Sequence, residues 1–206
     1  MSASDPVNPR AAADDQVGRR AARTREAIVD AAGQLFLDRG YAGTRINNIT
    51  EKCGISRAGF YTYFKDKRAV FNHIGEATYR DLLGIIGAWD RMPDPAPFDE
   101  LRAWVDRYFA FLDKHGAFIF SSGLSAPTDD DFRESARRMQ IRVGWLLGTA
   151  LRARQKSAPT DTPETLGLAI VGMIERGWFH ACAQGLPIDR DEMVSSLTAI
   201  VAAALA

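Results

Sequence analysis

The chain has little cysteine, no long hydrophobic run and no net charge. Its two cysteines, Cys53 and Cys182, have no partner at disulfide-framework or metal-ligand spacing, and the three histidines are too scattered for a metal site. Charged residues interrupt every apolar stretch before it reaches the roughly 20 residues of a membrane span. Residues 1–18 also lack the apolar core of a signal peptide. We therefore expect a cytoplasmic protein with no membrane contact, metal or other cofactor.

The balanced net charge hides an uneven distribution. The chain has 26 basic and 26 acidic residues, which by itself argues against a nucleic-acid-binding protein. Residues 10–72, however, contain 12 lysines and arginines and 7 acidic residues, whereas the chain from residue 73 onward contains 14 and 18. One end of the chain is basic and the other is acidic, so a nucleic acid would bind the basic end.

Helical periodicity runs through nearly the whole chain, and no segment shows a convincing strand alternation. In the first expected helix, about residues 19–39, apolar residues recur at intervals of three and four, and Gly40 ends the helix. Two short helices follow, with hydroxyl side chains at their starts, Thr44 and Ser56. We predict an all-α protein of about nine helices.

The segment from Gly54 to Lys67, GISRAGFYTYFKDK, carries the strongest functional signal. Phe60 and Phe64 form its only large apolar pair at helical spacing, so most of the second short helix needs no core contact. The remaining side chains are small, hydroxyl-bearing or cationic, which suits close approach to DNA, contact with phosphate oxygens and recognition of guanine. These free positions are Arg57, Ala58, Gly59, Tyr61, Thr62 and Tyr63.

Several of these features also have a purely structural interpretation. Tyr61 and Tyr63 could be core aromatics of a small domain, and Lys67 could be an ordinary surface lysine. The charge of Lys67 opposes the dipole at the start of its helix, which favours an external anion as its partner. Gly59 costs about 1 kcal/mol relative to alanine inside a helix, and close contact with DNA would offset that cost. The arginines of residues 19–25 could be a solvated helix start or a basic arm that follows DNA.

Residues 25–67 resemble the DNA-binding domain of the TetR (tetracycline repressor) family. About fifteen residues at fixed spacing carry the resemblance: Ile28, Ala31, Ala32, Phe36, Gly40, Thr44, Ile49, Gly54, Ile55, Ser56, Phe60, Tyr61, Tyr63, Phe64 and Lys67. The resemblance implies phosphate contacts by Thr44, Tyr61, Tyr63 and Lys67. It implies groove contacts by Arg45, Arg57, Ala58, Gly59 and Thr62. The family often has glycine where this chain has Ala58, so base preference does not follow from the resemblance.

The helix pattern and the resemblance together suggest the domain organisation. We expect an N-terminal arm without regular structure in residues 1–18 and a three-helix domain with the helix-turn-helix in residues 19–66. A helical ligand-binding and dimerisation domain would follow in residues 67–206. Its first helix would join the two domains and end before a stretch dense in proline.

An excess of aromatic residues marks the C-terminal domain. Most of them must serve as core, yet the expected helix at about residues 98–115 is apolar over more than half of its circumference. A cavity between helices is the usual place for a small-molecule site in such a bundle. We expect its lining to include Trp104, Tyr108, Phe111, Met139, Trp145, Val171 and Ile174. Since few of these side chains are polar, we expect an apolar ligand, with Tyr108 as its hydrogen-bond donor.

Two charged residues, Glu175 and Arg176, interrupt an otherwise apolar helix, and two interpretations stay open. They could orient a ligand, or they could form a buried or interface ion pair.

The last two expected helices, beginning near Thr162 and at Asp189, carry many small residues that let helices approach closely. Two such helices from each of two subunits would form a four-helix interface, as the resemblance also implies. Burial within the monomer is the alternative. A twofold dimer would place two recognition helices about 34 Å apart, one turn of DNA, and predicts a palindromic operator.

No nucleophile elbow, phosphate-binding loop or metal-ligand spacing supports an enzyme. We predict a ligand-responsive transcriptional repressor that binds double-stranded operator DNA as a homodimer and is released by a small hydrophobic effector. The alternative is an architectural or activating DNA-binding protein whose aromatic domain serves only for dimerisation or for a protein partner.

Overall fold

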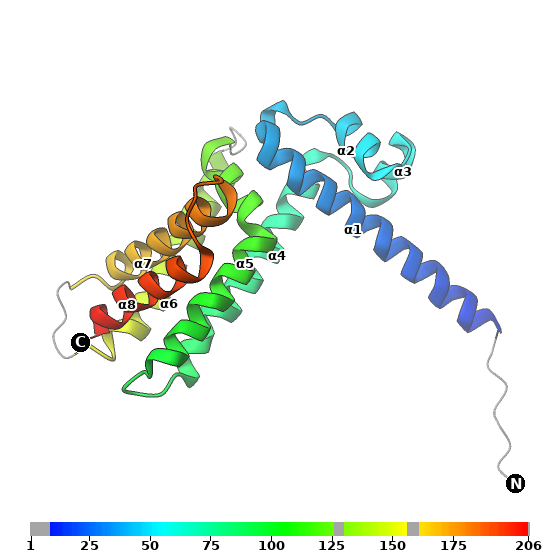
Figure 1. The fold of residues 1–206 in the computed structure, drawn as a ribbon. Helices are drawn as coiled ribbons and strands as arrows, with labels where there is room; N and C mark the ends of the chain where they lie inside the picture. Colours follow the sequence, from blue (N-terminus) through cyan, green and yellow to red (C-terminus); the bar gives the residue numbers. More distant parts are fainter. Residues whose placement is uncertain (1–8, 126–129, 156–160, 206) are drawn as a thin grey trace, which may run out of the picture. The chain divides into compact units, whose positions relative to one another are not determined.

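The computed structural model describes residues 9–125, 130–155 and 161–205, and every regular element in these ranges is helical (Figure 1). The elements are α1 (Pro9–Gly43), α2 (Ile46–Cys53), α3 (Arg57–Tyr63), α4 (Lys67–Gly87), the 3-10 turn η1 (Ala88–Arg91), α5 (Phe98–Ser125), α6 (Asp130–Arg152), α7 (Pro163–Trp178), the π-helical turn η2 (Phe179–Ala183) and α8 (Arg190–Leu205). The predicted all-α fold is confirmed, and the eight α-helices of the described residues are close to the expected nine.

The chain divides into two compact units between Ile74 and Gly75, inside α4. The first unit holds α1, α2, α3 and the start of α4, and the second holds the rest of α4 and the helices that follow. The division lies further along the chain than the boundary expected after residue 66. Within the described ranges, no helix is both long enough and apolar enough to cross a membrane.

Helix α1 is longer than the sequence predicted. It begins at Pro9, so residues 9–18, expected to be without regular structure, are helical, and residues 1–8 lie outside the described ranges. Proline suits the first turn of a helix, and the three alanines of residues 11–13 have the highest helix propensity, which explains the extension. The helical path breaks at Gly40, whose φ of 71° is strained for residues with a Cβ, at the end point that the sequence indicated.

The first unit has a small core built from all four of its helices. Its fully buried apolar residues are Ile28, Ala32, Phe36, Ile49, Phe60, Val70 and Phe71. The ring of Phe71 packs edge-on against Phe36 at 5.4 Å and against Tyr41 at 4.9 Å between centroids. Helix α3 contributes a single buried residue, Phe60, so the rest of its circumference is available for other contacts.

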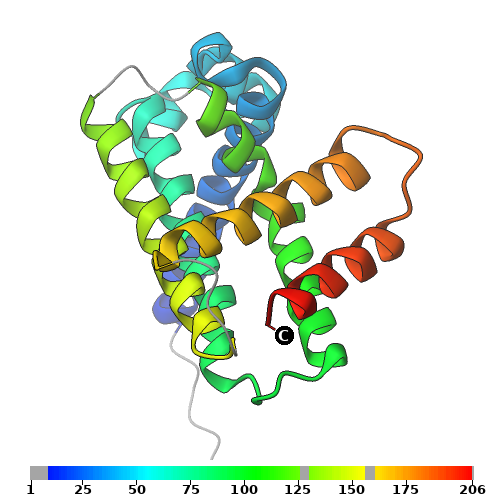
Figure 2. The same cartoon turned by 90° about the vertical axis from the view of Figure 1, so that its left-hand side faces the viewer.

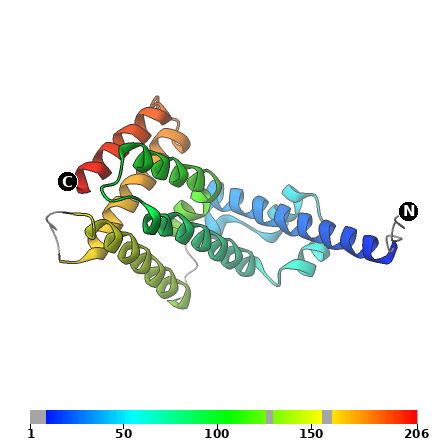
Figure 3. The same ribbon diagram turned by 90° about the horizontal axis from the view of Figure 1, so that it is seen from below.

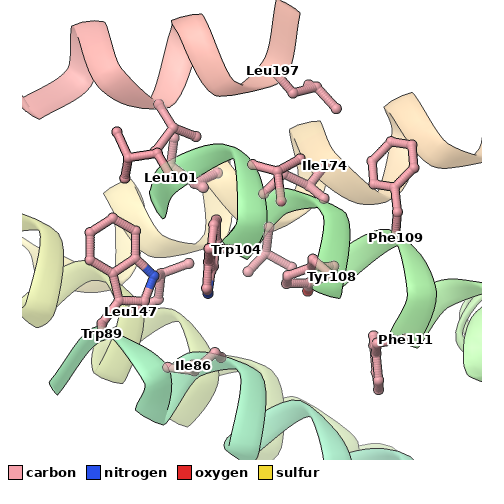
Figure 4. Packing of buried hydrophobic residues seen from close by; sticks show 14 of the residues in the cluster. Ile86, Trp89, Leu101, Trp104, Tyr108, Phe109, Phe111, Leu147, Ile174 and Leu197 are labelled. Atoms are coloured by element: carbon pink, nitrogen blue, oxygen red, sulfur yellow. The ribbon is translucent and has the colours of Figure 1, made fainter. Parts of the chain in front are cut away.

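In the second unit, α5 supplies the largest share of the core and packs against α7 and α8 (Figures 2 and 3). Buried side chains converge on it from every other helix of the unit, including Ile86 of α4, Leu147 of α6, Ile174 of α7 and Leu197 of α8 (Figure 4). The core of this unit is therefore organised around α5, the helix whose wide apolar surface the sequence had shown.

Helices α6 and α7 cross with their backbones in contact. A Cβ atom added at Gly167 would lie 1.9 Å from the carbonyl oxygen of Gly144, and one added at Gly148 would lie 1.8 Å from that of Pro163. Only glycine fits at such distances. Some of the small residues near the C-terminus thus serve packing within the monomer.

We expect Gly167→Ala to lower the free energy of unfolding by about 3 kcal/mol or more, because two helix backbones must separate to admit one methyl group. Gly84→Ala is the matched control, since a Cβ there meets no atom within 4 Å. The control should raise stability by up to about 1 kcal/mol through helix propensity. Urea unfolding of both variants measures the difference, and equal midpoints would contradict the close helix contact.

Candidate nucleic-acid interface and effector core

Helices α2 and α3 form the helix-turn-helix. Helix α2 ends at Gly54, whose φ of 68° places it in the left-handed region that glycine adopts easily. The Ser56 side chain then caps α3 by accepting a hydrogen bond from the Gly59 amide at 3.0 Å. A Cβ at position 59 would lie only 3.3 Å from that same Ser56 oxygen. The helix cap therefore gives a structural reason why position 59 is a glycine, in addition to the expected close approach to DNA.

The face of α3 opposite Phe60 is exposed. Arg57, Ala58, Tyr61 and Thr62 are all exposed, and Gly59 and Tyr63 are partly buried. Tyr61 retains 44% of its accessible surface, so it is not a core aromatic of this unit. The small, hydroxyl-bearing and cationic side chains identified in the sequence thus lie on one accessible helix surface.

Arg57 is held in place by groups from both helices. Its guanidinium donates to Oδ1 of Asn47 at 2.7 Å and to the Tyr61 hydroxyl at 3.1 Å, and it lies 5.6 Å from the centre of the Tyr61 ring. Asn47, in the first turn of α2, and Arg45, directly before that helix, are both exposed. The sequence analysis did not include Asn47 among the site residues. The available signal was its side-chain amide, which lies two residues after Arg45, close to the predicted start of the helix.

Thr44 and Lys67 have internal partners. The Thr44 hydroxyl oxygen is buried and lies 3.0 Å from the Leu35 carbonyl and 2.9 Å from that of Gly40. The Lys67 ammonium donates to the carbonyls of Tyr41 at 2.6 Å and Thr44 at 2.7 Å, and partial burial lowers its pKa. The sequence argument expected an external anion at Lys67, but its partners are carbonyls 23 and 26 residues away along the chain.

A hollow lies beside this corner, entirely within the first unit. Its lining residues are Tyr41, Ala42, Thr44, Arg45, Ile46, Asn47, Arg57, Asp66, Lys67 and Arg68. Four of these ten residues are cationic and one is acidic. A concave surface of this charge suits the phosphate groups of a nucleic acid.

The second unit buries five of the seven residues expected to line a ligand cavity. Trp104, Tyr108, Phe111, Val171 and Ile174 all belong to its main hydrophobic cluster (Figure 4). They are packed closely: the ring of Tyr108 lies 5.8 Å from that of Trp104 and 5.7 Å from that of Phe111, both edge-on. These five residues form a continuous core in which a ligand would have to displace side chains.

The other two expected lining residues, Met139 and Trp145, are on the surface. They are 38% and 47% exposed on α6, so their assignment to an internal cavity is wrong. Helix α6 turns Val143, Leu147 and Leu151 inward, four residues apart, and Trp145, two residues from Val143 and from Leu147, lies on the opposite side. Met139 has the spacing of the inward residues, but none of residues 133–142 of α6 is buried. Trp145 instead lines a surface hollow together with arginines of the same helix.

A polar pair lies within the aromatic core. Tyr108 is fully buried, and its hydroxyl has no partner in hydrogen-bond geometry among the described residues. The Glu175 carboxylate of α7 lies near enough to interact with it, and burial together with this negative charge raises the pKa of Tyr108 well above its usual value. Burial also raises the pKa of Glu175 to about 7, although Tyr108 and Arg176 act in the opposite direction.

Arg176 does not form an ion pair with Glu175 in the described part of the chain. Its guanidinium lies over two aromatic rings, 5.7 Å from the centre of Phe120 and 5.3 Å from that of Phe179. The arginine is exposed, whereas the glutamate is partly buried and directed toward α5. The sequence left two interpretations open, a pair that orients a ligand and an ion pair. An ion pair between these two side chains is absent.

Lys67→Ala should lower the free energy of unfolding by about 1–3 kcal/mol, because it removes two hydrogen bonds from a charged donor to partly buried carbonyls. Lys65→Ala, at an exposed neighbouring position, removes the same charge and should change stability by less than about 0.5 kcal/mol. Chemical denaturation of both variants tests this. Equal effects of the two substitutions would mean that the contacts of Lys67 add nothing to stability.

Glu175 should make stability depend on pH. Its pKa in the folded protein is about 7 against an ordinary value of 4.5, so the unfolded chain ionises first as the pH rises, and folding loses stability between these values. Relative to Glu175→Gln, which does not titrate, the native chain should lose about 1–3 kcal/mol between pH 5 and pH 8. Unfolding measured at both pH values checks this, and a pH-independent difference between the two proteins would contradict the burial of the carboxylate.

Comparison with known proteins supports the interpretation of the first unit. Residues 28–74 match the family model described as bacterial regulatory proteins, tetR family. This segment runs from the middle of α1 into α4 and includes the whole helix-turn-helix.

Curated regulators resemble much of the chain. It is 29% identical over 195 residues to the HTH-type transcriptional regulator EthR of Mycolicibacterium smegmatis (strain ATCC 700084 / mc(2)155), covering 89% of this chain and 88% of that protein. It is 28% identical over 176 residues to the HTH-type transcriptional repressor BepR of Brucella suis biovar 1 (strain 1330), covering 78% and 82%. The match to the HTH-type transcriptional repressor DhaR of Mycobacterium sp. (strain GP1), 30% identical over 107 residues, spans 51% of this chain and 54% of that protein.

Solved structures share the fold. A crystal structure of AibR in complex with isovaleryl coenzyme A and operator DNA has a TM-score of 0.67 and 17% identity, covering 88% of this chain and 98% of that one. A transcriptional regulator from Aquifex aeolicus VF5 has a TM-score of 0.62 and 17% identity, with coverages of 86% and 97%. TetR family members are DNA-binding regulators and not enzymes. Residues 28–74 thus match the tetR family model, and the whole chain resembles curated HTH-type transcriptional regulators in sequence and solved transcriptional regulators in fold.

Proposed function

We propose that this regulator represses transcription by binding a palindromic operator as a homodimer, and that a small, largely apolar effector releases it. The observation that carries the proposal is the exposed polar face of α3, with Arg57, Tyr61 and Thr62. Arg57 lines the same hollow as Arg45, the residue before α2. None of these side chains belongs to the buried core of the first unit. Contact with a nucleic acid gives them a role.

In this proposal Arg57 reads a base. Its guanidinium is already oriented by Asn47 and Tyr61, so less conformational freedom is lost when it meets the two acceptors of a guanine. Ala58 and Gly59 have small side chains, so the helix can approach the DNA groove closely. The Thr62 hydroxyl can then also form a hydrogen bond in the groove.

The phosphate contacts fall to residues around this helix. We assign them to Tyr61, Tyr63 and Lys67, and not to the Thr44 hydroxyl, which internal carbonyls already engage. Arg45 stays assigned to the groove. An ammonium group has three N–H donors, and the carbonyls of Tyr41 and Thr44 use two of them in Lys67. The third remains for a phosphate oxygen in the adjoining hollow.

The proposed dimer interface is the outer surface of α7 and α8, which pack against each other. Small exposed residues recur at helical spacing there: Ala169, Gly172, Ser196, Ala199 and Ala203. Ile200 lies among them with half of its surface exposed. A surface of small and apolar side chains on two adjacent helices can pack closely against the same surface of a second subunit around a twofold axis. This supports a four-helix interface.

The effector would bind in the aromatic core of the second unit and act through α4. The indole nitrogen of Trp104 donates to the Ile85 carbonyl of α4 at 3.0 Å, so a ligand that displaces Trp104 disturbs that helix. Helix α4 begins at Lys67, which closes the corner of the DNA-binding unit. The effector can shift the equilibrium only by as much as its affinity differs between the two arrangements.

Arg57→Ala should weaken binding to an operator selected from a random-sequence DNA pool by about 1–3 kcal/mol and relax preference at one base position. Arg142→Ala removes one exposed charge from the second unit and serves as the control. Fluorescence anisotropy at fixed salt compares the two variants with the native protein. Full affinity of Arg57→Ala for the operator would refute the assignment of α3 to the groove.

Ala199→Arg should convert the dimer to monomers, because it places a long charged side chain in a closely packed interface. Gln140→Arg adds the same charge to the exposed side of α6 and should leave the dimer intact. Sedimentation velocity distinguishes the two species. An unchanged dimer of Ala199→Arg would place the interface on another surface.

A further inference from the structure

We infer that the effector is an amphiphilic amine: an apolar or aromatic compound whose cationic nitrogen is held between the Glu175 carboxylate and the Tyr108 hydroxyl. The inference rests on the proposed function, because it names the ligand class of the same aromatic core. It depends on two polar groups, one from α5 and one from α7, that the fold brings together in that core without a cation beside them in the described chain.

The first group is the Tyr108 hydroxyl. The side chain is fully buried on α5, beside Ile174 and between Trp104 and Phe111 (Figure 4). Nearly all buried polar atoms in native proteins have a hydrogen-bond partner, and this hydroxyl has none in the described chain. A phenylalanine would fill the same space without an unpaired donor, so the hydroxyl is best explained by a partner that arrives from outside.

The second group is the Glu175 carboxylate. Its helical neighbours Val171, Ile174 and Trp178 are buried apolar residues, and no ion pair links it to a described residue. Its sequence neighbour Arg176 interacts with it only at a distance, because that guanidinium covers the Phe120 and Phe179 rings. A carboxylate in such surroundings is stabilised most by a cation that enters the core with it.

The surrounding rings favour the same ligand charge. Aromatic faces attract cations, and Trp104, Tyr108 and Phe111 form a continuous row whose middle member, Tyr108, interacts with the carboxylate. The row continues to Trp89, 5.2 Å from Trp104, and offers an apolar surface for the body of a ligand. A carboxylate or phosphate ligand would be repelled by Glu175, and a sugar would find too few polar partners. An amine with an apolar body satisfies every group of the site.

The test uses the full chain at pH 7.5 and three matched sets of probes. Each set has one apolar body with an amine, an alcohol or a carboxylate: hexylamine, 1-hexanol and hexanoate; decylamine, 1-decanol and decanoate; 2-phenylethylamine, 2-phenylethanol and phenylacetate. Calorimetry gives the affinities, and anisotropy of labelled operator gives release. We expect at least one amine to bind at least tenfold more tightly than its alcohol and its carboxylate, and to release the operator.

Variants assign the binding to the site. Glu175→Gln should weaken binding of that amine at least tenfold and leave the affinity of the matched alcohol unchanged. Glu164→Gln makes the same substitution at the start of the same helix, where the side chain lines a surface hollow, and should change neither affinity. Tyr108→Phe should weaken the amine severalfold without loss of the fold, and it carries the test if Glu175→Gln does not fold.

Three outcomes would overturn the inference. If in all three sets the alcohol or the carboxylate binds as tightly as the amine, or if the amine affinity is unchanged in both site variants, Glu175 has no role in binding, while a ligand-responsive repressor stays in place. Absence of binding by all nine probes also contradicts the inference. Operator binding by the ligand-free protein and its loss in Arg57→Ala test the DNA-binding function separately.

Discussion

The hydrogen bonds that close the corner between α1 and α2 are the constraint on which the DNA-binding unit depends. Carbonyls at a helix end need partners, and here the Lys67 ammonium and the Thr44 hydroxyl supply them. These bonds fix the start of α2, and Phe60 alone anchors α3 in the core. Because α3 needs no other packing contact, its polar side chains can stay exposed at a defined position. Lys67 thus holds the corner, whereas the exposed Arg57 is left for the proposed contact with DNA.

The second unit uses the opposite arrangement of polar groups. Its helices are held by apolar burial and by backbone contact between α6 and α7 at Gly144 and Gly167, which leaves no room for a ligand there. The polar groups of Tyr108 and Glu175 lie instead on the aromatic side of the core, where they interact with each other and no ion pair of a described residue reaches the carboxylate. Such groups destabilise the ligand-free form, and a complementary ligand gains from pairing them. The proposed sensitivity to an effector follows from these two polar groups, which have no cationic partner in the described chain.

Local signals predicted much of the fold, and contacts distant in sequence escaped prediction. The glycine at position 54, the Ser56 cap and the buried Phe60 were all readable, since each depends on neighbours within one or two helical turns. The partners of Lys67 were not readable, because the fold brings them from more than twenty residues away. On α6, apolar residues alternate through positions 139–147, and helical periodicity alone did not show that Trp145 faces outward. The five expected lining residues on α5 and α7 are buried, as their apolar spacing indicated, and their contact with a ligand stays a prediction.

The central claim, that the exposed face of α3 lies against DNA, can be tested by hydroxyl-radical footprinting of the protein with and without operator. Tyr61 on α3 and Trp145 on α6 are aromatic side chains of similar exposure, 44% and 47%, in different units. The account predicts that the selected operator protects Tyr61 from oxidation and leaves Trp145 unchanged, whereas unrelated DNA at the same concentration protects Tyr61 far less. Oxidation of Tyr61 at the same rate in bound and free protein would contradict it.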